Sequence, residues 1–140
     1  MNNEQVELVQ SSFAKVAPIA DQAAIIFYDE LFQRDPSLRP LFTEDMTEQR
    51  KKLMTMLGMA VNGLKNWDST QRVVANLGAR HVGYGVKPEY YPTVGAALLA
   101  TLSKGLGDDF TPEVEEAWTA AYTALSGTMI EAAADKAVAE

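Results

Sequence analysis

The sequence divides into helical stretches of unequal length, with prolines and capping residues at their boundaries. Apolar residues recur three and four positions apart within these stretches, and no stretch shows the two-residue alternation that demands a strand. Residues 36–42, PSLRPLF, hold two prolines four residues apart and can form only a short helical piece. A simple four-helix bundle needs helices of similar length. The sequence therefore predicts an all-α fold with six or seven unequal helices.

The expected helices begin and end at recognisable residues. Asn2 or Asn3 can cap the first helix, Asp35 precedes Pro36, and Thr111 precedes Pro112. We expect helices up to Val16, over 19–34, within 36–42, over 47–64, from Ser69 toward His81, from Pro88 through Leu102, and from Pro112 through Met129. Gly105, Gly107 and Asp108–Asp109 are expected to end the helix that Pro88 opens. Residues 66–69 are expected to form a loop, and residues 132–140 a frayed end.

Composition narrows the class of protein. The 140 residues are expected to form one domain, 1–140, and an apolar fraction of 47% argues against disorder. The formal net charge of -7 disfavours nucleic-acid and anionic-membrane partners, which require a basic face. No signal peptide is visible, and no apolar run approaches the length of a membrane span. A soluble cytoplasmic protein is expected.

The stretch 73–91, VVANLGARHVGYGVKPEYY, contains His81, which is the only histidine in a chain without cysteine. A metal or cofactor that requires an imidazole would have to use this residue. His81 follows Leu77 by four residues, so the two share a helix face, and Gly83, Gly85 and Pro88 mark a helix end and a new start. From this stretch alone, an ordinary surface or core histidine is the more common outcome, and both interpretations stay open.

Three stretches together resemble one known family. They are residues 25–42, IIFYDELFQRDPSLRPLF, residues 77–95, LGARHVGYGVKPEYYPTVG, and residues 115–125, EEAWTAAYTAL. In this order, and with Phe42 thirty-nine residues before His81, they resemble single-domain bacterial haemoglobins related to the globin domain of flavohaemoglobins. The resemblance covers nearly the whole chain. It implies the globin fold around one haem pocket and haem b as the cofactor.

The resemblance also implies roles for individual residues. His81 matches the axial ligand of the haem iron, and Phe42 matches the phenylalanine that stacks on the porphyrin. Tyr28 and Gln49 match distal residues, where a hydroxyl or an amide can donate a hydrogen bond to polarised O2. Tyr91 matches a tyrosine on the proximal side. An ordinary core phenylalanine would also account for the surroundings of Phe42.

Further residues complete the implied pocket. The residues expected to enclose the porphyrin with apolar surface are Phe27, Leu53, Leu57, Leu77, Val86 and Val94, with Leu53 above the iron. Lys52 and Arg80 are candidate partners for the haem propionates, although solvated surface charges are at least as common. Relatives fused to a reductase have a glutamate in the last helix that falls on Ala133 here, and Glu131 lies on another helix face. We therefore expect the Nδ1–H of His81 to bond to the Leu77 carbonyl, with Tyr91 as a secondary neighbour.

Two classes of function follow from the resemblance. The first is reversible binding of O2, NO or CO for transport, storage or sensing. The second is oxidation of nitric oxide to nitrate, and because the sequence shows no Gly-rich dinucleotide fingerprint, electrons would come from a separate reductase. A haem-free globin used in signalling is a third interpretation, which the complete set of pocket residues disfavours. The expected oligomeric state is a monomer or a homodimer.

Overall fold

A computed structural model describes residues 2–42, 44–83 and 88–139, and of residues 81–83, 88 and 133–139 it describes the backbone alone. The described α-helices are α1 (Asn3–Val16), α2 (Ala20–Arg34), α3 (Thr47–Asn62), α4 (Trp67–Gly83), α5 (Tyr91–Leu106) and α6 (Pro112–Ala139). Short 3₁₀ helices connect them, namely η1 (Ala17–Ile19), η2 (Pro36–Leu41), η3 (Gly63–Asn66), η4 (Pro88–Tyr90) and η5 (Gly107–Asp109). The described ranges contain no strand, which confirms the predicted all-α class.

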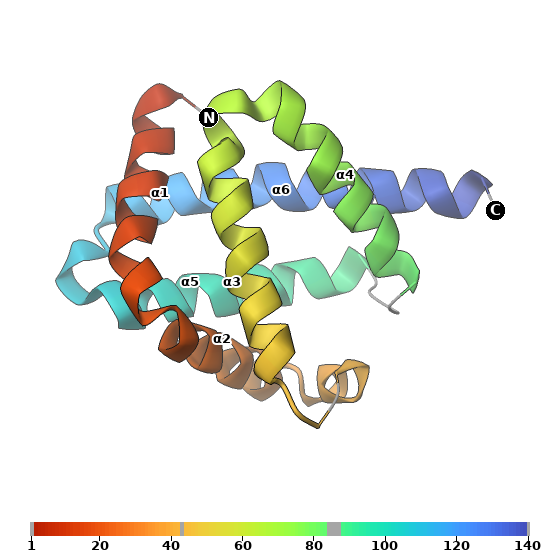
Figure 1. Cartoon of the computed structure of the whole chain (residues 1–140), viewed down its shortest axis with the longest axis horizontal. Helices are drawn as coiled ribbons and strands as arrows, with labels where there is room; N and C mark the ends of the chain where they lie inside the picture. The colour runs from red at the N-terminus through yellow and green to blue at the C-terminus, as the bar shows by residue number, and fades with distance from the viewer. Residues whose placement is uncertain (1, 43, 84–87, 140) are drawn as a thin grey trace.

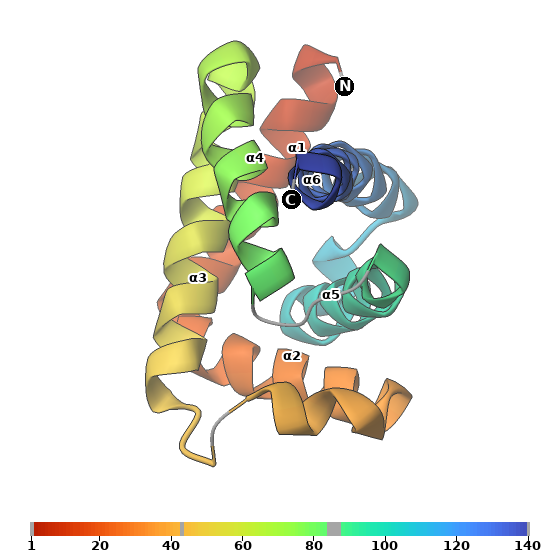
Figure 2. The ribbon, with the colours of Figure 1, turned by 90° about the vertical axis from the view of Figure 1, so that its right-hand side faces the viewer.

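The helices cross one another instead of running parallel as in a simple bundle. α5 and α6 lie side by side, α1, α3 and α4 cross over them, and α2 lies across one end of the molecule (Figures 1 and 2). The short helix η2 and the connector after it lead from α2 into α3 at that end (Figure 2).

Several predicted helix boundaries are confirmed. At each of them a side chain caps the first turn of the helix. The side chain of Asn2 accepts a hydrogen bond from the Gln5 N–H at 2.7 Å, and Gln5 Oε1 accepts one from the Asn2 N–H at 3.1 Å. This reciprocal capping satisfies two N–H groups that the first helical turn leaves unpaired. Asp35 Oδ1 accepts a hydrogen bond from the Ser37 N–H at 3.1 Å, and Thr111 Oγ1 accepts one from the Val114 N–H at 3.3 Å.

The predicted loop at residues 66–69 is wrong. η3 runs to Asn66, and α4 begins at Trp67 without an intervening loop, so Ser69 lies inside the helix and does not cap it. The side chain of Thr70 donates a hydrogen bond to the Gly63 carbonyl at 2.9 Å, which satisfies a backbone acceptor at the turn. A Cβ at Gly63 would collide with the Thr70 side chain, so glycine is required for the close approach of the two helices.

Two other boundaries differ from the prediction. Pro88 starts η4, and the α-helix begins three residues later at Tyr91. Gly105 lies inside α5, which ends at Leu106, and Gly107 has a φ of 56° that disfavours other residues. The backbone of α6 is helical as far as Ala139, through the segment from Ala132 onward where the sequence predicts a frayed end, and the many alanines of the segment favour helix.

One core connects the helices. It contains the buried apolar residues of α1, α2, α3, α5 and α6, among them Val9, Phe27, Leu31, Val61, Leu98, Leu102, Val114 and Trp118. Trp118 is only 1% exposed, and its Nε1 donates a hydrogen bond to Ser12 Oγ at 2.8 Å, which joins α6 to α1 in the middle of this core. Burial of an aromatic ring with its polar group paired stabilises the crossing.

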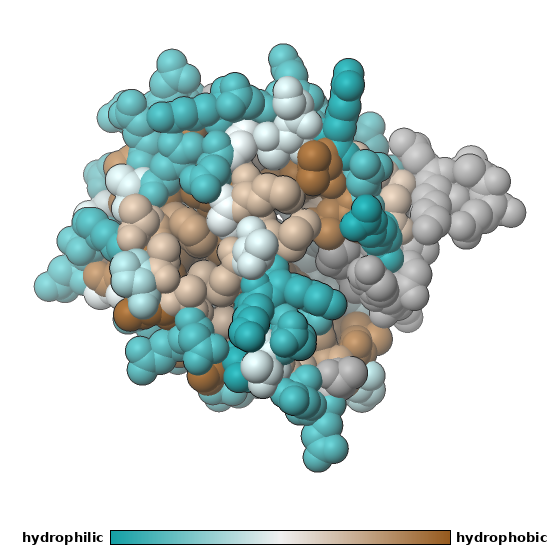
Figure 3. Space-filling view, in the orientation of Figure 1, coloured by the Kyte–Doolittle hydropathy of each residue, from teal (hydrophilic) through white to brown (hydrophobic). Residues whose placement is uncertain are grey.

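The described surface carries hydrophilic side chains together with some exposed apolar ones. On the face shown in Figure 3, strongly hydrophobic residues form separate spots among hydrophilic side chains. The exposed large apolar residues are Ile19, Ile25, Leu41, Met59 and Val73. Among the described residues, no helix has both the length and the apolar character that a membrane crossing requires.

α4 and α6 approach each other closely at Gly78. A Cβ built on Gly78 would lie 2.5 Å from the Cα of Met129, so a side chain there would meet backbone. Substitution of Gly78 by alanine should therefore force the two helices apart and lower the free energy of unfolding by roughly 1–3 kcal/mol. Urea denaturation of the purified protein measures this difference.

Gly127 provides the matched control for this substitution. It is exposed in α6, and a Cβ there would meet nothing within 4 Å. Gly127→Ala should raise the free energy of unfolding by about 1 kcal/mol, because alanine has the higher helix propensity. Equal effects of the two substitutions would contradict the close approach at Gly78.

Candidate functional site

Tyr28 and Gln49 bring a hydroxyl and an amide together between α2 and α3. Gln49 Nε2 donates a hydrogen bond to Tyr28 Oη at 3.2 Å, and Tyr28 is only 6% exposed. Burial raises the pKa of the Tyr28 hydroxyl, and the hydrogen bond from Gln49 offsets only part of that rise. The phenol is therefore neutral at ordinary pH. Because its oxygen accepts from Gln49, its own O–H remains available to donate to another group.

Aromatic rings surround Tyr28 and hold it in place. Its ring centroid lies 5.0 Å from that of Phe27, 5.5 Å from that of Phe42 and 5.9 Å from that of Phe32. Phe27 and Phe42 meet it edge-on, whereas Phe32 stacks on it, and both geometries are favourable for aromatic pairs. Phe42 follows η2 and is half-buried. The two predicted site residues Tyr28 and Phe42 are thus in direct contact.

The predicted apolar wall is partly assembled by the described residues. Leu53 and Leu57 lie one turn apart on α3, and together with Phe27 they line a small cavity of about 20 Å³ between α1, α2, α3 and α5. Leu77 of α4 and Val94 of α5 are half-buried as well. Half-exposed leucines and valines are a surface that an apolar ligand would cover favourably, at about 25 cal/mol for each Å² removed from water.

Tyr91 begins α5 with a buried side chain. Its hydroxyl is buried and has no hydrogen-bond partner among the described residues, and burial raises its pKa. Buried polar groups are normally paired, so this hydroxyl fits a polar group that the described part of the chain does not supply. The carbonyl of the same residue accepts a hydrogen bond from the Tyr122 hydroxyl at 2.6 Å.

Sequence reasoning missed the part that Tyr122 and Gly95 play in holding Tyr91. A Cβ on Gly95 would lie 2.7 Å from the Tyr122 ring, so the glycine admits that ring against α5. Burial raises the pKa of the Tyr122 hydroxyl well above its ordinary value. Tyr122 lies one turn after Trp118 in the stretch 115–125, and Gly95 one turn after Tyr91. These spacings were the only signals available.

The remaining predicted site residues are either exposed or lie outside the described part of the chain. Lys52 and Arg80 are exposed and form no ion pair with a described residue. His81 lies in the last turn of α4, but its side chain and all of Val86 lie outside the described residues, as does the predicted hydrogen bond from His81 to the Leu77 carbonyl. Glu131 is exposed on α6.

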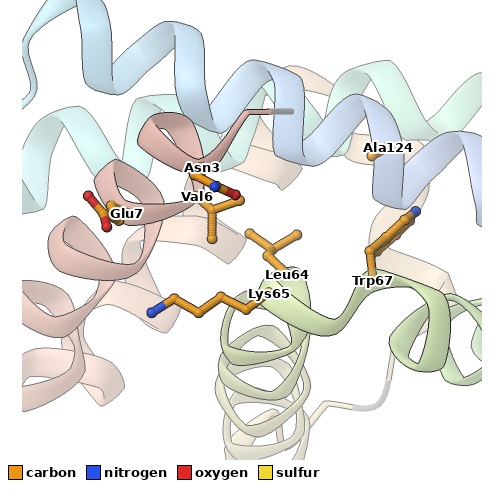
Figure 4. Close-up of a pocket in the computed structure, with 7 residues that line it drawn as sticks. All are labelled: Asn3, Val6, Glu7, Leu64, Lys65, Trp67 and Ala124. Atoms are coloured by element: carbon orange, nitrogen blue, oxygen red, sulfur yellow. The ribbon is translucent and has the colours of Figure 1, made fainter.

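A separate cleft of about 490 Å³ lies at the other end of α3. Its lining comes from α1, η3, α4 and α6 (Figure 4), and consists of Asn3, Val6, Glu7, Leu64, Lys65, Trp67 and Ala124. In Figure 4, Glu7 and Lys65 lie at one end and Trp67 at the other. Both charged residues are exposed, and none of the predicted site residues lines this cleft.

Comparison with known proteins agrees with this geometry. The family model described as Globin matches residues 25–129. The flavohemoprotein of Bacillus subtilis is 28% identical over 133 residues, which are 93% of this chain and 33% of that protein. The chain therefore spans about a third of the length of that relative.

Solved structures give the same result. A bacterial globin from Campylobacter jejuni is 25% identical with a TM-score of 0.85, covering 99% of this chain and 100% of its own. An engineered carbene transferase, made from a candidate nitric oxide dioxygenase of Rhodothermus marinus, is 25% identical with a TM-score of 0.87, covering 100% of this chain and 99% of its own.

Proposed function

The chain belongs to the globin family, and from this premise we propose that it binds haem b between α2, α3, α4 and α5 and uses it to bind O2 or another diatomic gas such as NO or CO. Haem is the cofactor of this family, and its iron supplies the gas-binding chemistry when the group is bound. We also propose that residues 1–140 form one globin domain, because helices from both ends of the chain share one core. The observation that carries the proposal is the hydrogen bond between the buried Tyr28 and the half-buried Gln49.

The described residues fit a haem group. Its flat faces are apolar, and Phe42, Leu53, Leu57, Leu77 and Val94 offer half-buried apolar side chains that would cover them. A haem site also needs a protein ligand for the iron, and the only imidazole of the chain belongs to the last turn of α4. We propose that the neighbouring Val86 adds to this wall and that Lys52 and Arg80, which are exposed, pair with the propionates.

On the proximal side, we propose that His81 donates its Nδ1–H to the carbonyl of Leu77, one turn earlier in α4. Tyr91 is the proposed secondary neighbour, since its buried hydroxyl has no partner among the described residues. Glu131 is exposed and so is a poor candidate for the carboxylate that would make the imidazole more electron-donating. A neutral carbonyl partner favours reversible binding of a gas over peroxidase chemistry.

On the distal side, Tyr28 is the proposed hydrogen-bond donor to the gas. Its O–H is neutral and buried, and it has no acceptor among the described residues. The Gln49 amide is already bonded to the phenol oxygen, which supports a role in orienting Tyr28. This division of work differs from the sequence expectation, in which both residues donate directly to the ligand. A donor in a site shielded from water stabilises a polarised ligand more strongly than the same donor in water.

Removal of the Tyr28 hydroxyl should speed the escape of O2. A hydrogen bond to a charged or strongly polarised group contributes roughly 1.5–3 kcal/mol, so Tyr28→Phe should raise the O2 off-rate by about one to two decades. Gln49→Leu should have a smaller effect, because it only releases the orientation of the phenol. Stopped-flow displacement of O2 by CO measures both rates, with Tyr90→Phe as the tyrosine control. Off-rates within twofold of wild type for both site variants would refute the assignment.

Replacement of His81 should abolish stable haem binding. No other imidazole exists in the chain, so His81→Ala leaves the iron without a histidine ligand. The expected result is loss of haem on gel filtration, or a changed absorption spectrum that added imidazole restores.

The wild-type ferrous protein should be free of bis-histidine ligation, because one chain has only one histidine. Unchanged ferrous and CO-bound spectra in His81→Ala would show that another residue holds the iron.

Nitric oxide dioxygenation is the second proposed function. Similarity to a flavohemoprotein and to a candidate nitric oxide dioxygenase favours it. The reaction needs electrons, and we propose that a separate reductase supplies them. With NADH and a flavin reductase added, the protein should consume NO and produce nitrate in the presence of O2, and Tyr28→Phe should slow turnover. An NO electrode measures the rate. Consumption no faster than with the reductase alone would leave reversible gas binding as the function.

A further inference from the structure

The guanidinium of Arg39 binds the backbone on both sides of residue 43. Arg39 lies in η2, where its Nη1 donates to the Phe42 carbonyl at 3.4 Å and its Nη2 donates to the Glu44 carbonyl at 3.2 Å. Phe42 is extended, with φ -117° and ψ 157°, and ends the short helix. Neither carbonyl belongs to a helix, and the guanidinium supplies each with a hydrogen bond that helical backbone would otherwise supply.

The same guanidinium also packs on the aromatic cluster. Its Cζ lies 5.4 Å from the centroid of the Phe32 ring, within the range of a cation–π contact. Phe32 meets Phe42 edge-on, with 5.5 Å between centroids, and stacks on Tyr28. The guanidinium therefore contacts Phe42 directly at its carbonyl and indirectly through the Phe32 ring. Through the same Phe32 ring it also acts on Tyr28.

We propose that Arg39 is a positioning residue of the haem site. It fixes the ring of Phe42 and, through Phe32, the ring of Tyr28, so that it slows both haem loss and the escape of the gas. This inference rests on the proposed function, because that proposal places Phe42 and Tyr28 against haem and gas. The proposed action of Arg39 is exerted through these two rings.

The chemistry requires arginine at this position. A guanidinium is flat, so it can stack on Phe32 while its two outer nitrogens reach two different carbonyls. Lysine keeps the positive charge, but its three N–H donors share one nitrogen at the end of a flexible side chain. It therefore cannot stack on Phe32 and reach both carbonyls at once. Lysine therefore separates an effect of charge from an effect of shape.

The test compares Arg39→Ala and Arg39→Lys with Arg34→Ala. Arg34 is a nearby control, since its guanidinium forms an ion pair with Glu30 at 3.4 Å and is 41% exposed. The measurements are the rate of haem transfer from the ferric protein to excess apomyoglobin, the O2 off-rate, and the urea midpoint of the haem-free protein. The last measurement reports the general stability of the chain without the cofactor.

Arg39→Ala should raise both the haem-loss rate and the O2 off-rate by about three- to tenfold, as expected for loss of one cation–π contact and two hydrogen bonds. Arg39→Lys should behave more like Arg39→Ala than like wild type, and Arg34→Ala should stay within twofold of wild type. Phe32→Leu removes the stacking surface and should raise the O2 off-rate in the same direction. It carries the test if Arg39→Ala does not fold.

Three results would overturn the role of Arg39. They are unchanged rates in Arg39→Ala, equal increases in Arg34→Ala, and a fall in the urea midpoint without any change in haem loss or O2 off-rate, which describes a purely structural residue. Wild-type protein that fails to bind haem would instead overturn the proposed function and this role with it. The two failures are therefore distinguishable.

Discussion

The crossing of α4 over α6 at Gly78 is the contact on which the proposed site depends. At this point the backbones approach so closely that a Cβ would lie 2.5 Å from Met129. His81 follows Gly78 by three residues on α4, so the crossing determines where the backbone of His81 lies relative to α6. Protein interiors are close-packed and deform little. An added methyl group at Gly78 would therefore push α4 away from α6 and move His81, the residue proposed to hold the iron.

α6 is the common support for the other helices of the site. Trp118 binds Ser12 of α1, Tyr122 binds the carbonyl of Tyr91 at the start of α5, and Met129 meets α4. Trp118 and Tyr122 are four residues apart and Met129 follows Trp118 by eleven, so all three lie on one side of the helix. One face of a single helix thus positions α1, α4 and α5, and the aromatic groups of that face do this through hydrogen bonds as well as through packing.

The features that the sequence predicted are those with local causes. The caps at Asn2, Asp35 and Thr111 act on residues two or three positions away, so their residue types are enough to identify the boundaries. The loop predicted at residues 66–69 was wrong because Thr70 and Gly63 make a contact across seven residues, which no capping rule includes.

The contacts that shape the site have longer range. Gln49 reaches Tyr28 across 21 residues, and Tyr122 reaches the backbone of Tyr91 across 31. The resemblance to globins named Tyr28, Gln49 and Tyr91 but could not show which atom donates to which. Arg39 escaped notice altogether, because an arginine between two prolines has no periodic pattern and its partners are backbone carbonyls. The ligand-binding roles themselves stay predictions.

The two tyrosine hydroxyls of the site stay neutral over a wide range of pH. Burial raises the pKa of both Tyr28 and Tyr91 above the usual value of 10.0. An acid whose pKa is higher in the folded protein stabilises the fold below its unfolded pKa, and that contribution is lost as the pH rises through the folded pKa. Because both pKa values lie above 10.0, both hydroxyls remain protonated near pH 7, and this contribution to stability is fully present there. The site thus offers hydrogen-bond donors without introducing a buried charge, which would require its own partner and would draw water toward an apolar cofactor.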